Sequence, residues 1–397
     1  MADLPCWHVR RSCTVLVVPH SAQPLPARAD LVVVGAGIVG LAHALEAHSR
    51  GLTVAVVERD AYAVGASVRN FGHGCVTAQD GEAFTYALAA RERWLTHARQ
   101  AGFWAAETGT VVVARHDDEL AVLADLVALR DGAATLLDPD GVASRLPHVP
   151  DDVVGGAFLA LDVRVDPRTA VPALGAWLAA QPRASIHWST TFHGTEPGAG
   201  TTLVRTSRGD VVAGRVVVAV GHDVDRHYPA AATAAGVQRC TLQMLRVALP
   251  GAASVEPGVL SGTSLLRYAA FARSPHLAHV RARLAATQPA LLDAEVNLML
   301  TQRPDGTVLL GDSHTAGPAE APFRAEPVDE LLLREGAALL GTGPLHVLER
   351  WTGTYATAPG QFLVTAAEPG VLAVSVTSGI GMTTALGLAP HTLDSFL

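Results

Sequence analysis

Short apolar runs without alternating polar positions recur along the chain, and they predict strands buried on both faces of a parallel sheet. The predicted strands lie at 31–34, 54–57, 110–114, 153–159, 214–221 and 372–376. Apolar residues at helical spacing predict helices at 82–101, 117–130, 167–180 and 328–340. Asp166 and Pro167 are placed to open the third of these helices as its N-cap and first residue. Strands that alternate with helices are typical of an α/β fold.

From about residue 238 the pattern changes to strands that follow one another without long helices between them. These strands are predicted at 241–249, 265–272, 297–302 and 307–310. Strands in such succession favour an antiparallel sheet, and we interpret this part of the chain as a separate α+β substrate domain.

The segment after the first predicted strand carries Gly35, Gly37 and Gly40 in the pattern G-x-G-x-x-G. In a βαβ unit the first glycine permits a tight turn, the second lets a pyrophosphate approach the backbone, and the third lets the helix pack on the strand. The helix that follows directs its free N–H groups at the phosphates. Glu58 ends the next strand, close to the spacing expected for a carboxylate that accepts hydrogen bonds from an adenosine ribose. Together these features predict a dinucleotide-binding site.

The chain of 397 residues has a net charge of −8, and all 29 of its basic residues are arginines. The acidic balance argues against a nucleic-acid or anionic-membrane surface, and no apolar run approaches the roughly 18 residues of a membrane span. The absence of lysine excludes Schiff-base and Walker A chemistry. Four cysteines without C-x-x-C spacing favour a reducing, cytoplasmic location and give no indication of a metal site. Asn70 and Asn297 are the only asparagines, which suggests that each has a role.

Two further segments are placed to meet a ligand. Residues 65–79 form a glycine-rich polar loop after the second predicted strand, at the carboxyl end of the sheet, where α/β folds bind ligands. Residues 377–389 predict a strand, a glycine turn and a helix.

The chain resembles the D-amino-acid oxidase, glycine oxidase and sarcosine oxidase superfamily of FAD enzymes in four strings. They are the glycine fingerprint, Ala-Ser-Val-Arg-Asn-Phe-Gly at 66–72, Val-Val-Val-Ala-Val-Gly at 216–221 and Ser-Gly-Ile-Gly-Met-Thr at 378–383. More closely, it looks like the FAD-dependent oxidoreductases associated with phosphonate catabolism, in shorter strings at 67–73, 242–246, 311–314 and 349–353. The similarity keeps the same order from about residue 30 to the end.

This resemblance implies a Rossmann-like FAD-binding domain with an inserted antiparallel-sheet substrate domain. The first would comprise 30–78, 165–237 and 345–397, the second 79–164 and 238–344, and 1–29 would be a disordered N-terminal extension. The residues expected to bind FAD are Gly35, Gly37, Ile38, Val39, Gly40, Glu58, Arg59, Ser67, Asn70, Phe71, Gly72, Gly221, Gly379, Ile380, Gly381, Met382 and Thr383.

The chemistry implied by the superfamily is hydride transfer from an amine carbon to flavin N5, followed by hydrolysis of the imine. The amine must be bound neutral, with its C–H close to N5. A helix that begins at 379–382 would stabilise the reduced flavin with its N–H groups and its dipole. Oxygen or another oxidant would then accept the electrons.

Two features depart from the superfamily. Amino-acid-oxidising members usually offer Gly-x-Arg-Pro after a Trp-x-Gly turn, whereas this chain has Tyr355 at the position of that arginine. The lysine that sarcosine oxidases use to assist oxygen is also missing. We therefore expect Tyr355 and a positive charge from His73 or Arg69 at the catalytic site. The candidates for binding a substrate anion are Arg267, Tyr268, Gln302, Ser313, His314 and Trp351.

The substrate predicted on these grounds is a small aminophosphonate, an N-alkylated 2-aminoethylphosphonate, which would give phosphonoacetaldehyde and the free amine. Two alternatives stay open. One is an oxidase of the glycine, sarcosine or D-amino-acid type, and the other is a flavin-binding protein without turnover.

Overall fold

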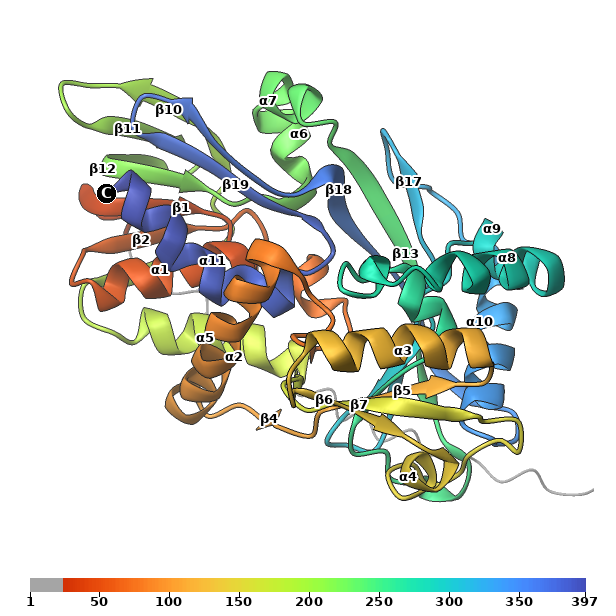
Figure 1. Cartoon of the computed structure of the whole chain (residues 1–397). Helices are drawn as coiled ribbons and strands as arrows, with labels where there is room; N and C mark the ends of the chain where they lie inside the picture. Colours follow the sequence, from red (N-terminus) through yellow and green to blue (C-terminus); the bar gives the residue numbers. More distant parts are fainter. Residues whose placement is uncertain (1–23) are drawn as a thin grey trace, which may run out of the picture.

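The computed structural model describes residues 24–397 (Figure 1). The expected disordered extension at 1–29 therefore lies mostly outside the described residues, and its last two residues belong to strand β1 (Arg28–Val34). Within the described chain the fold is a mixed α/β fold, as predicted, built on one continuous sheet of 16 strands.

Five parallel strands form the first half of this sheet. In order along the sheet they are β19 (Val371–Ser378), β12 (Gly209–Val218), β1, β2 (Val54–Val57) and β9 (Ala184–His187). Successive residues of β1 alternate between two hydrophobic cores, with Leu31 and Val33 in one and Val32 and Val34 in the other. Burial on both faces therefore explains the unbroken apolar run.

Helices cover one face of the parallel strands, and a β-hairpin covers the other (Figure 1). The helices are α1 (Ile38–Ser49), α2 (Gly81–Ala101), α5 (Pro167–Ala179) and α11 (Gly381–Phe396). The hairpin consists of β10 (Phe192–Pro197) and β11 (Thr202–Thr206). Helix α5 begins as predicted, because the Asp166 side chain accepts a hydrogen bond from the Arg168 N–H at 3.2 Å. Among the described helices, none combines the length and the apolar character that crossing a membrane requires.

The second half of the sheet is mainly antiparallel and is covered by further helices around a core of its own. Its strands run in the order β13 (Gln238–Ala248), β16 (Val308–Gly311), β15 (Met299–Gln302), β14 (Gly258–Leu260), β5 (Thr110–Ala114), β7 (Gly155–Leu159) and β6 (Ala134–Leu137). The main helices are α3 (Asp117–Leu129), α8 (Leu277–Thr287) and α10 (Glu326–Leu339). The remaining short elements are β3 (His73–Gly74), β4 (Ala105–Ala106), β8 (Val163–Val165), β17 (Thr315–Gly317), α4 (Pro139–Ala143), α6 (Val224–His227), α7 (Pro229–Ala234) and α9 (Pro289–Asp293).

One long strand, β18 (His346–Glu368), joins the two halves of the sheet (Figure 1). Its first part pairs with β13 and its second part with β19. Thr357 lies at the changeover, because its register partners are Gln238 of β13 and Ser378 of β19. The sequence pattern did not predict this strand.

Helix α2 differs from the expected domain division, which grouped 79–164 with the substrate domain. Tyr86 and Trp94 belong to the same hydrophobic core as Leu31 of β1. The Trp94 Nε1 also donates to the backbone oxygen of Met382 at 2.7 Å. Helix α2 therefore packs with the dinucleotide-binding half, because its apolar face meets α11.

The strand predicted at 265–272 is wrong. This segment forms two 3₁₀ turns, Gly262–Leu266 and Phe271–Arg273, with Arg267 between them. The Arg267 N–H donates to the Ser264 oxygen at 3.1 Å, three residues back, which is the 3₁₀ pattern. Leu265 is fully buried by the turn, so the apolar residues that suggested a strand are buried without one.

The contact between α2 and α11 gives a test of this packing. A Cβ added to Gly387 would lie 2.0 Å from the backbone oxygen of Tyr86, so Gly387→Ala must push the two helices apart. We expect the free energy of unfolding to fall by about 1–3 kcal/mol, the usual cost of overpacking, in denaturant titrations followed by circular dichroism. Gly343→Ala is the control, because a Cβ there meets no heavy atom within 4 Å. Equal stabilities of the two variants would contradict the contact.

Candidate functional site

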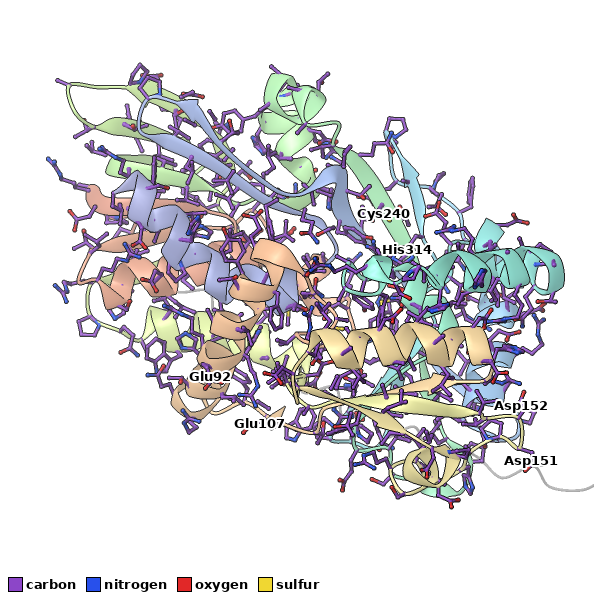
Figure 2. All side chains as sticks on the ribbon, in the orientation of Figure 1. Glu92, Glu107, Asp151, Asp152, Cys240 and His314 are labelled. Atoms are coloured by element: carbon purple, nitrogen blue, oxygen red, sulfur yellow. The ribbon has the colours of Figure 1, made fainter. Side chains whose placement is uncertain are left out.

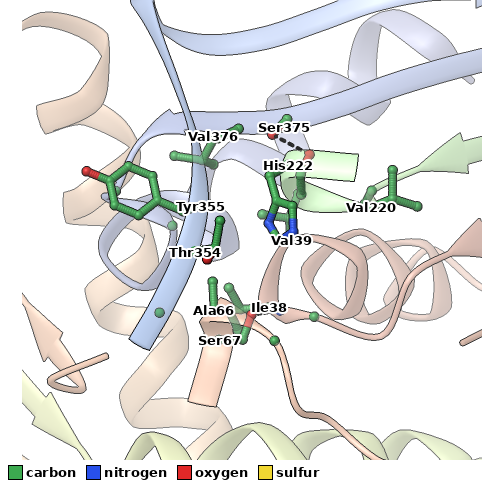
Figure 3. A pocket seen from close by; sticks show the side chains of 18 of the residues that line it. Ile38, Val39, Ala66, Ser67, Val220, His222, Thr354, Tyr355, Ser375 and Val376 are labelled. Carbon is green, nitrogen blue, oxygen red and sulfur yellow. Dashed lines mark hydrogen bonds between the residues drawn. The ribbon is translucent and has the colours of Figure 1, made fainter. Parts of the chain in front are cut away.

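A cavity of about 560 Å³ lies where the carboxyl ends of the parallel strands meet the antiparallel half of the sheet. Figure 3 shows part of its wall, to which α1 contributes Ile38 and Val39 and β18 contributes Thr354 and Tyr355. Open α/β sheets bind their ligands at this edge. The cavity is therefore the candidate active site.

The glycine turn after β1 forms one part of the wall. Gly35 has a φ of 103°, and a Cβ there would lie 2.4 Å from a backbone oxygen. Gly37 lines the cavity, whereas Gly40 packs α1 on β1, since a Cβ there would lie 1.9 Å from the Gly35 oxygen. The Ile38 N–H donates to Ser67 Oγ at 2.9 Å, which ties the next loop to the turn. These positions fit the fingerprint's roles and leave a backbone cradle for a pyrophosphate.

Glu58 lies beside this turn with its carboxylate fixed by the backbone. Its Oε2 accepts from the Ala36 N–H at 2.8 Å and its Oε1 from the Asp60 N–H at 3.0 Å. Each oxygen keeps a lone pair for a ribose hydroxyl. Next to it, Arg59 pairs with the buried Asp223 at 2.5 Å. Burial alone would raise the pKa of Asp223, but neighbouring arginines hold it below its ordinary value.

The start of α11 forms another part of the wall, where residues 379–382 line the cavity. The first N–H groups of a helix have no acceptor within the helix, so this end offers donors and a positive dipole to a ligand. Gly379 leaves no room for a side chain, because its Cβ would lie 3.1 Å from both Arg267 and Tyr355.

These residues fit the expected flavin dinucleotide. Glu58 and the glycine turn line one end of the cavity and suit the adenosine and the pyrophosphate. The start of α11 lines the same cavity and suits the electron-rich edge of a reduced flavin. The predicted cofactor-binding residues on its wall are Gly35, Gly37, Ile38, Val39, Glu58, Arg59, Ser67, Asn70, Gly221, Gly379, Ile380, Gly381 and Met382.

Three other predicted cofactor-binding residues do not line the cavity. Phe71 belongs to the core of the antiparallel half. Gly72 packs closely, because a Cβ there would lie 1.9 Å from the Val165 oxygen. Thr383 turns its hydroxyl to the Cys75 N–H at 3.2 Å. All three support the wall from behind, so direct contact with the cofactor is not supported for them.

A cluster of polar side chains lines the cavity near Gly379. Its members are Arg267, Tyr268, Asn297, Asp312, His314 and Tyr355. The Arg267 Nη2 donates to the Tyr355 hydroxyl at 2.7 Å and to the Ser378 oxygen at 2.9 Å. The His314 ring packs edge-on against Tyr355, with 6.3 Å between centroids. Figure 2 shows His314 near Cys240 of β13, where the antiparallel half meets β18.

Burial sets the protonation of this cluster. It raises the pKa of Tyr268 and of Tyr355 well above the ordinary value, so both hydroxyls stay neutral. It also raises the pKa of the Asp312 carboxyl. Burial would lower the pKa of Arg267, but the acidic groups around it, Tyr355 and Asp312 first, hold that pKa above its ordinary value. Arg267 is therefore a permanent cation in the wall.

His73 lies outside the cavity wall, so its expected catalytic role is not supported. Its Nε2 bonds to Thr110 Oγ1 at 2.7 Å and to Asp162 Oδ2 at 3.1 Å, because β3 pairs with β8 and turns the ring into the interior. His73, Cys75 and Asp162 bring possible metal-ligand atoms within 4.8 Å of one another. The Asp162 Oδ1, however, already accepts two hydrogen bonds from Thr77 at 2.8 and 2.9 Å. We therefore interpret the side chains of His73 and Asp162 as hydrogen-bonding partners in the interior and not as metal ligands.

Three residues expected to bind an anion have structural partners instead and do not line the cavity. The Gln302 Oε1 accepts from a backbone N–H at 2.7 Å, and its Nε2 donates to two backbone oxygens. The Ser313 Oγ accepts from the Gln243 N–H at 3.3 Å. The Trp351 Nε1 donates to the Arg69 oxygen at 3.2 Å. The other predicted anion-binding residues, Arg267, Tyr268 and His314, do line the cavity.

Asp312 and Asn297 line the cavity but were not predicted as site residues. The Asn297 Nδ2 donates to Asp312 Oδ1 at 3.2 Å. The scarcity of asparagine was the available signal for Asn297. Asp312 stands directly before two predicted anion-binding residues, but a carboxylate was not predicted there because an anionic substrate requires positive charge and neutral donors.

Solved structures share this fold. Glycine oxidase from Geobacillus kaustophilus is 16% identical with a TM-score of 0.74, over 94% of this chain and 95% of that one. L-amino acid deaminase from Proteus vulgaris is 18% identical with a TM-score of 0.75, over 95% of each chain. Iminodiacetate oxidase from Chelativorans sp. BNC1 is 17% identical with a TM-score of 0.70, over 92% of this chain and 94% of that one.

Sequence comparison with curated proteins gives no significant match. The model of the DAO family, described as FAD dependent oxidoreductase, matches residues 30–394 and so extends over most of the chain. The chain belongs to the DAO family of FAD-dependent oxidoreductases.

Proposed function

We propose that this FAD-dependent oxidoreductase oxidises a small amine that carries an anionic group, and that its substrate is an N-alkylated 2-aminoethylphosphonate. Bound FAD supplies the acceptor for the hydride that leaves the carbon next to the amine nitrogen. Hydrolysis of the resulting imine gives phosphonoacetaldehyde and the free amine, and oxygen or another oxidant takes up the electrons. The residues of the chain bind and orient the substrate.

The observation that carries this proposal is that only one nitrogen of the Arg267 guanidinium is hydrogen-bonded by the described residues. Its Nη2 is held by the Tyr355 hydroxyl and the Ser378 oxygen, whereas its Nη1 and Nε have no hydrogen-bond partner among residues 24–397. Because Arg267 lines the cavity, these free donors suit a bidentate anion. Tyr355, at the position where amino-acid-oxidising members carry arginine, holds this arginine in place.

Phosphonate is favoured by the motif resemblance and by the neutral donors around Arg267. A phosphonate has three oxygens and up to two charges, so it can use the Tyr355 hydroxyl in addition to the guanidinium. A glycine- or sarcosine-type amino acid is the second candidate, because one free guanidinium edge also suits a carboxylate. One of the solved structures that shares the fold is a glycine oxidase.

Arg69 remains the proposed positive charge on the cofactor side. It lines the cavity, and its Nη1 donates to the Thr352 oxygen at 3.3 Å. Without a lysine in the chain, this arginine is the side chain we propose to assist electron transfer from the reduced flavin to its acceptor.

Anaerobic bleaching of the flavin absorbance tests the function. N-methyl-2-aminoethylphosphonate, sarcosine and N-methylpropylamine share the methylated nitrogen and differ in the anion. We expect the phosphonate to reduce the flavin fastest and to release phosphonoacetaldehyde. Faster reduction by sarcosine would favour the second candidate, and a flavin that no amine reduces would contradict catalysis altogether.

Arg267→Ala should raise the KM for the anionic amine about tenfold or more, because charge-assisted hydrogen bonds contribute roughly 1.5–3 kcal/mol each. The kinetics of N-methylpropylamine should change little, since the lost contact is uniform binding. Arg273→Ala is the matched control, because Arg273 lies in the same turn region, is exposed and pairs with Asp80 at 3.1 Å. Equal losses on charged and uncharged amines would show that Arg267 supports the fold or the cofactor instead.

Glu58→Gln tests the cofactor contact. The variant keeps the shape of the side chain but turns an NH₂ group toward the backbone N–H of Ala36 or Asp60, both of which need an acceptor. We expect the Kd for FAD to rise about tenfold or more, measured by equilibrium dialysis of the apoprotein. Glu92→Gln, exposed on α2 (Figure 2), is the control. Unchanged affinity in Glu58→Gln would place the ribose elsewhere.

A further inference from the structure

The buried Asp312 and the half-buried Arg267 carry opposite charges and line one cavity, but they form no ion pair with each other. Within residues 24–397 the Arg267 side chain donates only to neutral oxygens, those of Tyr355 and Ser378. Among the described residues, the one basic group at ion-pair distance from Asp312 is His314, whose Nε2 lies 3.9 Å from Oδ2. Buried charges without partners are costly, so each of these groups is suited to a charge that a ligand brings.

One hydrogen-bond acceptor is left open on the Asp312 side of the cavity. The side chain of Asp312 accepts from Asn297 Nδ2 through Oδ1, at 3.2 Å. Its Oδ2 accepts no hydrogen bond from the described part of the chain, and it is not among the sealed polar atoms of the interior. This open acceptor matches an ammonium group, which has only donors.

His314 does not fill this need while it is neutral. Its Nδ1 lies 2.9 Å from the Glu295 oxygen, and a carbonyl can only accept, so Nδ1 carries the proton. The neutral ring then presents an unprotonated Nε2 to Asp312. Asp312 therefore keeps an open position for a cation at the pH where His314 is uncharged.

We propose that Asp312 binds the ammonium group of the substrate and takes its proton while Arg267 binds the anionic end, so that the enzyme accepts its substrate as a zwitterion. This inference rests on the proposed amine oxidation, and it holds for either anion, phosphonate or carboxylate. In this role Asp312 is a catalytic residue. The opposite charges of Asp312 and Arg267 together determine which class of substrate the enzyme accepts.

The proton step balances without a further reactant. The ammonium nitrogen gives one proton to Asp312 Oδ2, which leaves a neutral amine and a carboxylic acid. The nitrogen lone pair freed in this way can form the C=N bond, for which bound FAD would supply the hydride acceptor. Asp312 returns its proton to water after the product departs. Burial raises the pKa of Asp312, which brings its proton affinity nearer to that of an amine.

The charged and titratable groups around Asp312 come from several elements. They are Arg267 and Tyr268 between the two 3₁₀ turns, Cys240 on β13, Tyr355 on β18 and His314 directly after Asp312. Burial raises the pKa of the two tyrosines and of Cys240, so these stay neutral near pH 8. Arg267, the two tyrosines and Cys240 therefore already carry their protons and cannot accept one from the substrate.

Binding of matched ligands to the holoenzyme tests the charge recognition. 2-(Trimethylammonio)ethylphosphonate and 3,3-dimethylbutylphosphonate have the same shape but differ by the positive charge, and neither can be oxidised at a nitrogen lone pair. Trimethylammonioacetate and 3,3-dimethylbutanoate form the same pair with a carboxylate. By calorimetry we expect the cation of at least one pair to bind tenfold or more tightly than its isostere. Wild-type protein without such a preference overturns the inference.

Asp312→Asn keeps the shape and the contact with Asn297 but removes the charge. We expect the variant to bind the cationic ligand and its isostere within about threefold, with the isostere bound no more weakly than by the wild type. Asp140→Asn, on the surface in α4, should keep the wild-type preference. If Asp312→Asn does not fold, Asp312→Ser replaces it. A cation preference that survives the loss of the carboxylate overturns the inference.

The pH profile of kcat/KM tests the proton step. With Asp312 present, the zwitterion is productive and the profile should be flat from pH 7 to 9. In Asp312→Asn only the neutral amine is productive, so kcat/KM should rise about tenfold per pH unit below the amine pKa. Parallel profiles would mean that Asp312 does not take the proton. Failure of every amine to reduce the flavin would reject the proposed function, whereas normal turnover with unchanged profiles and ligand preference rejects only the role of Asp312.

Discussion

The site depends on one strand that belongs to both halves of the sheet. Strand β18 is hydrogen-bonded to β13 up to Thr357 and to β19 beyond it. Tyr355 lies two residues before this changeover, opposite Cys240. Its hydroxyl holds Arg267, which also donates to Ser378 at the end of β19, three residues before α11 begins. Backbone pairing therefore fixes the distance between the group that we propose to bind a substrate anion and the helix that we propose to face the cofactor.

This geometry gives a role to Tyr355, which stands where the sequence resemblance led us to expect an arginine. The phenol is half-buried and neutral, so it stabilises a neighbouring cation without cancelling its charge. A carboxylate at the same place would form a buried ion pair with Arg267 and leave no charge for a ligand. With Tyr355 and the Ser378 carbonyl as its partners, the guanidinium is oriented and stays cationic. Tyr355 and Ser378 orient the guanidinium, whereas Arg267 itself supplies the charge.

The cofactor half could be predicted from sequence because its signals are local. The glycine turn, the buried strands and the cap at Asp166 each depend on residues that are neighbours in the chain. The substrate half could not, because its site is assembled from separate turns and strands. Arg267 lines the cavity, although its segment is a pair of 3₁₀ turns and not the strand predicted from its apolar residues. His73 was placed wrongly in the ligand loop, since its orientation depends on pairing with β8, about 90 residues further along the chain.

All basic residues of the chain are arginines, and this affects how the site responds to pH. A guanidinium keeps its proton at every physiological pH, whereas a buried lysine shifts its pKa readily. Arg267 is half-buried and its pKa stays above the ordinary value, so the end of the cavity that we propose to bind the anion keeps its charge. Asp312 lies on the same cavity wall, and burial raises the pKa of its carboxyl. The two ends of the site therefore differ in their proton chemistry, because only the Asp312 end carries a group that can take up a proton.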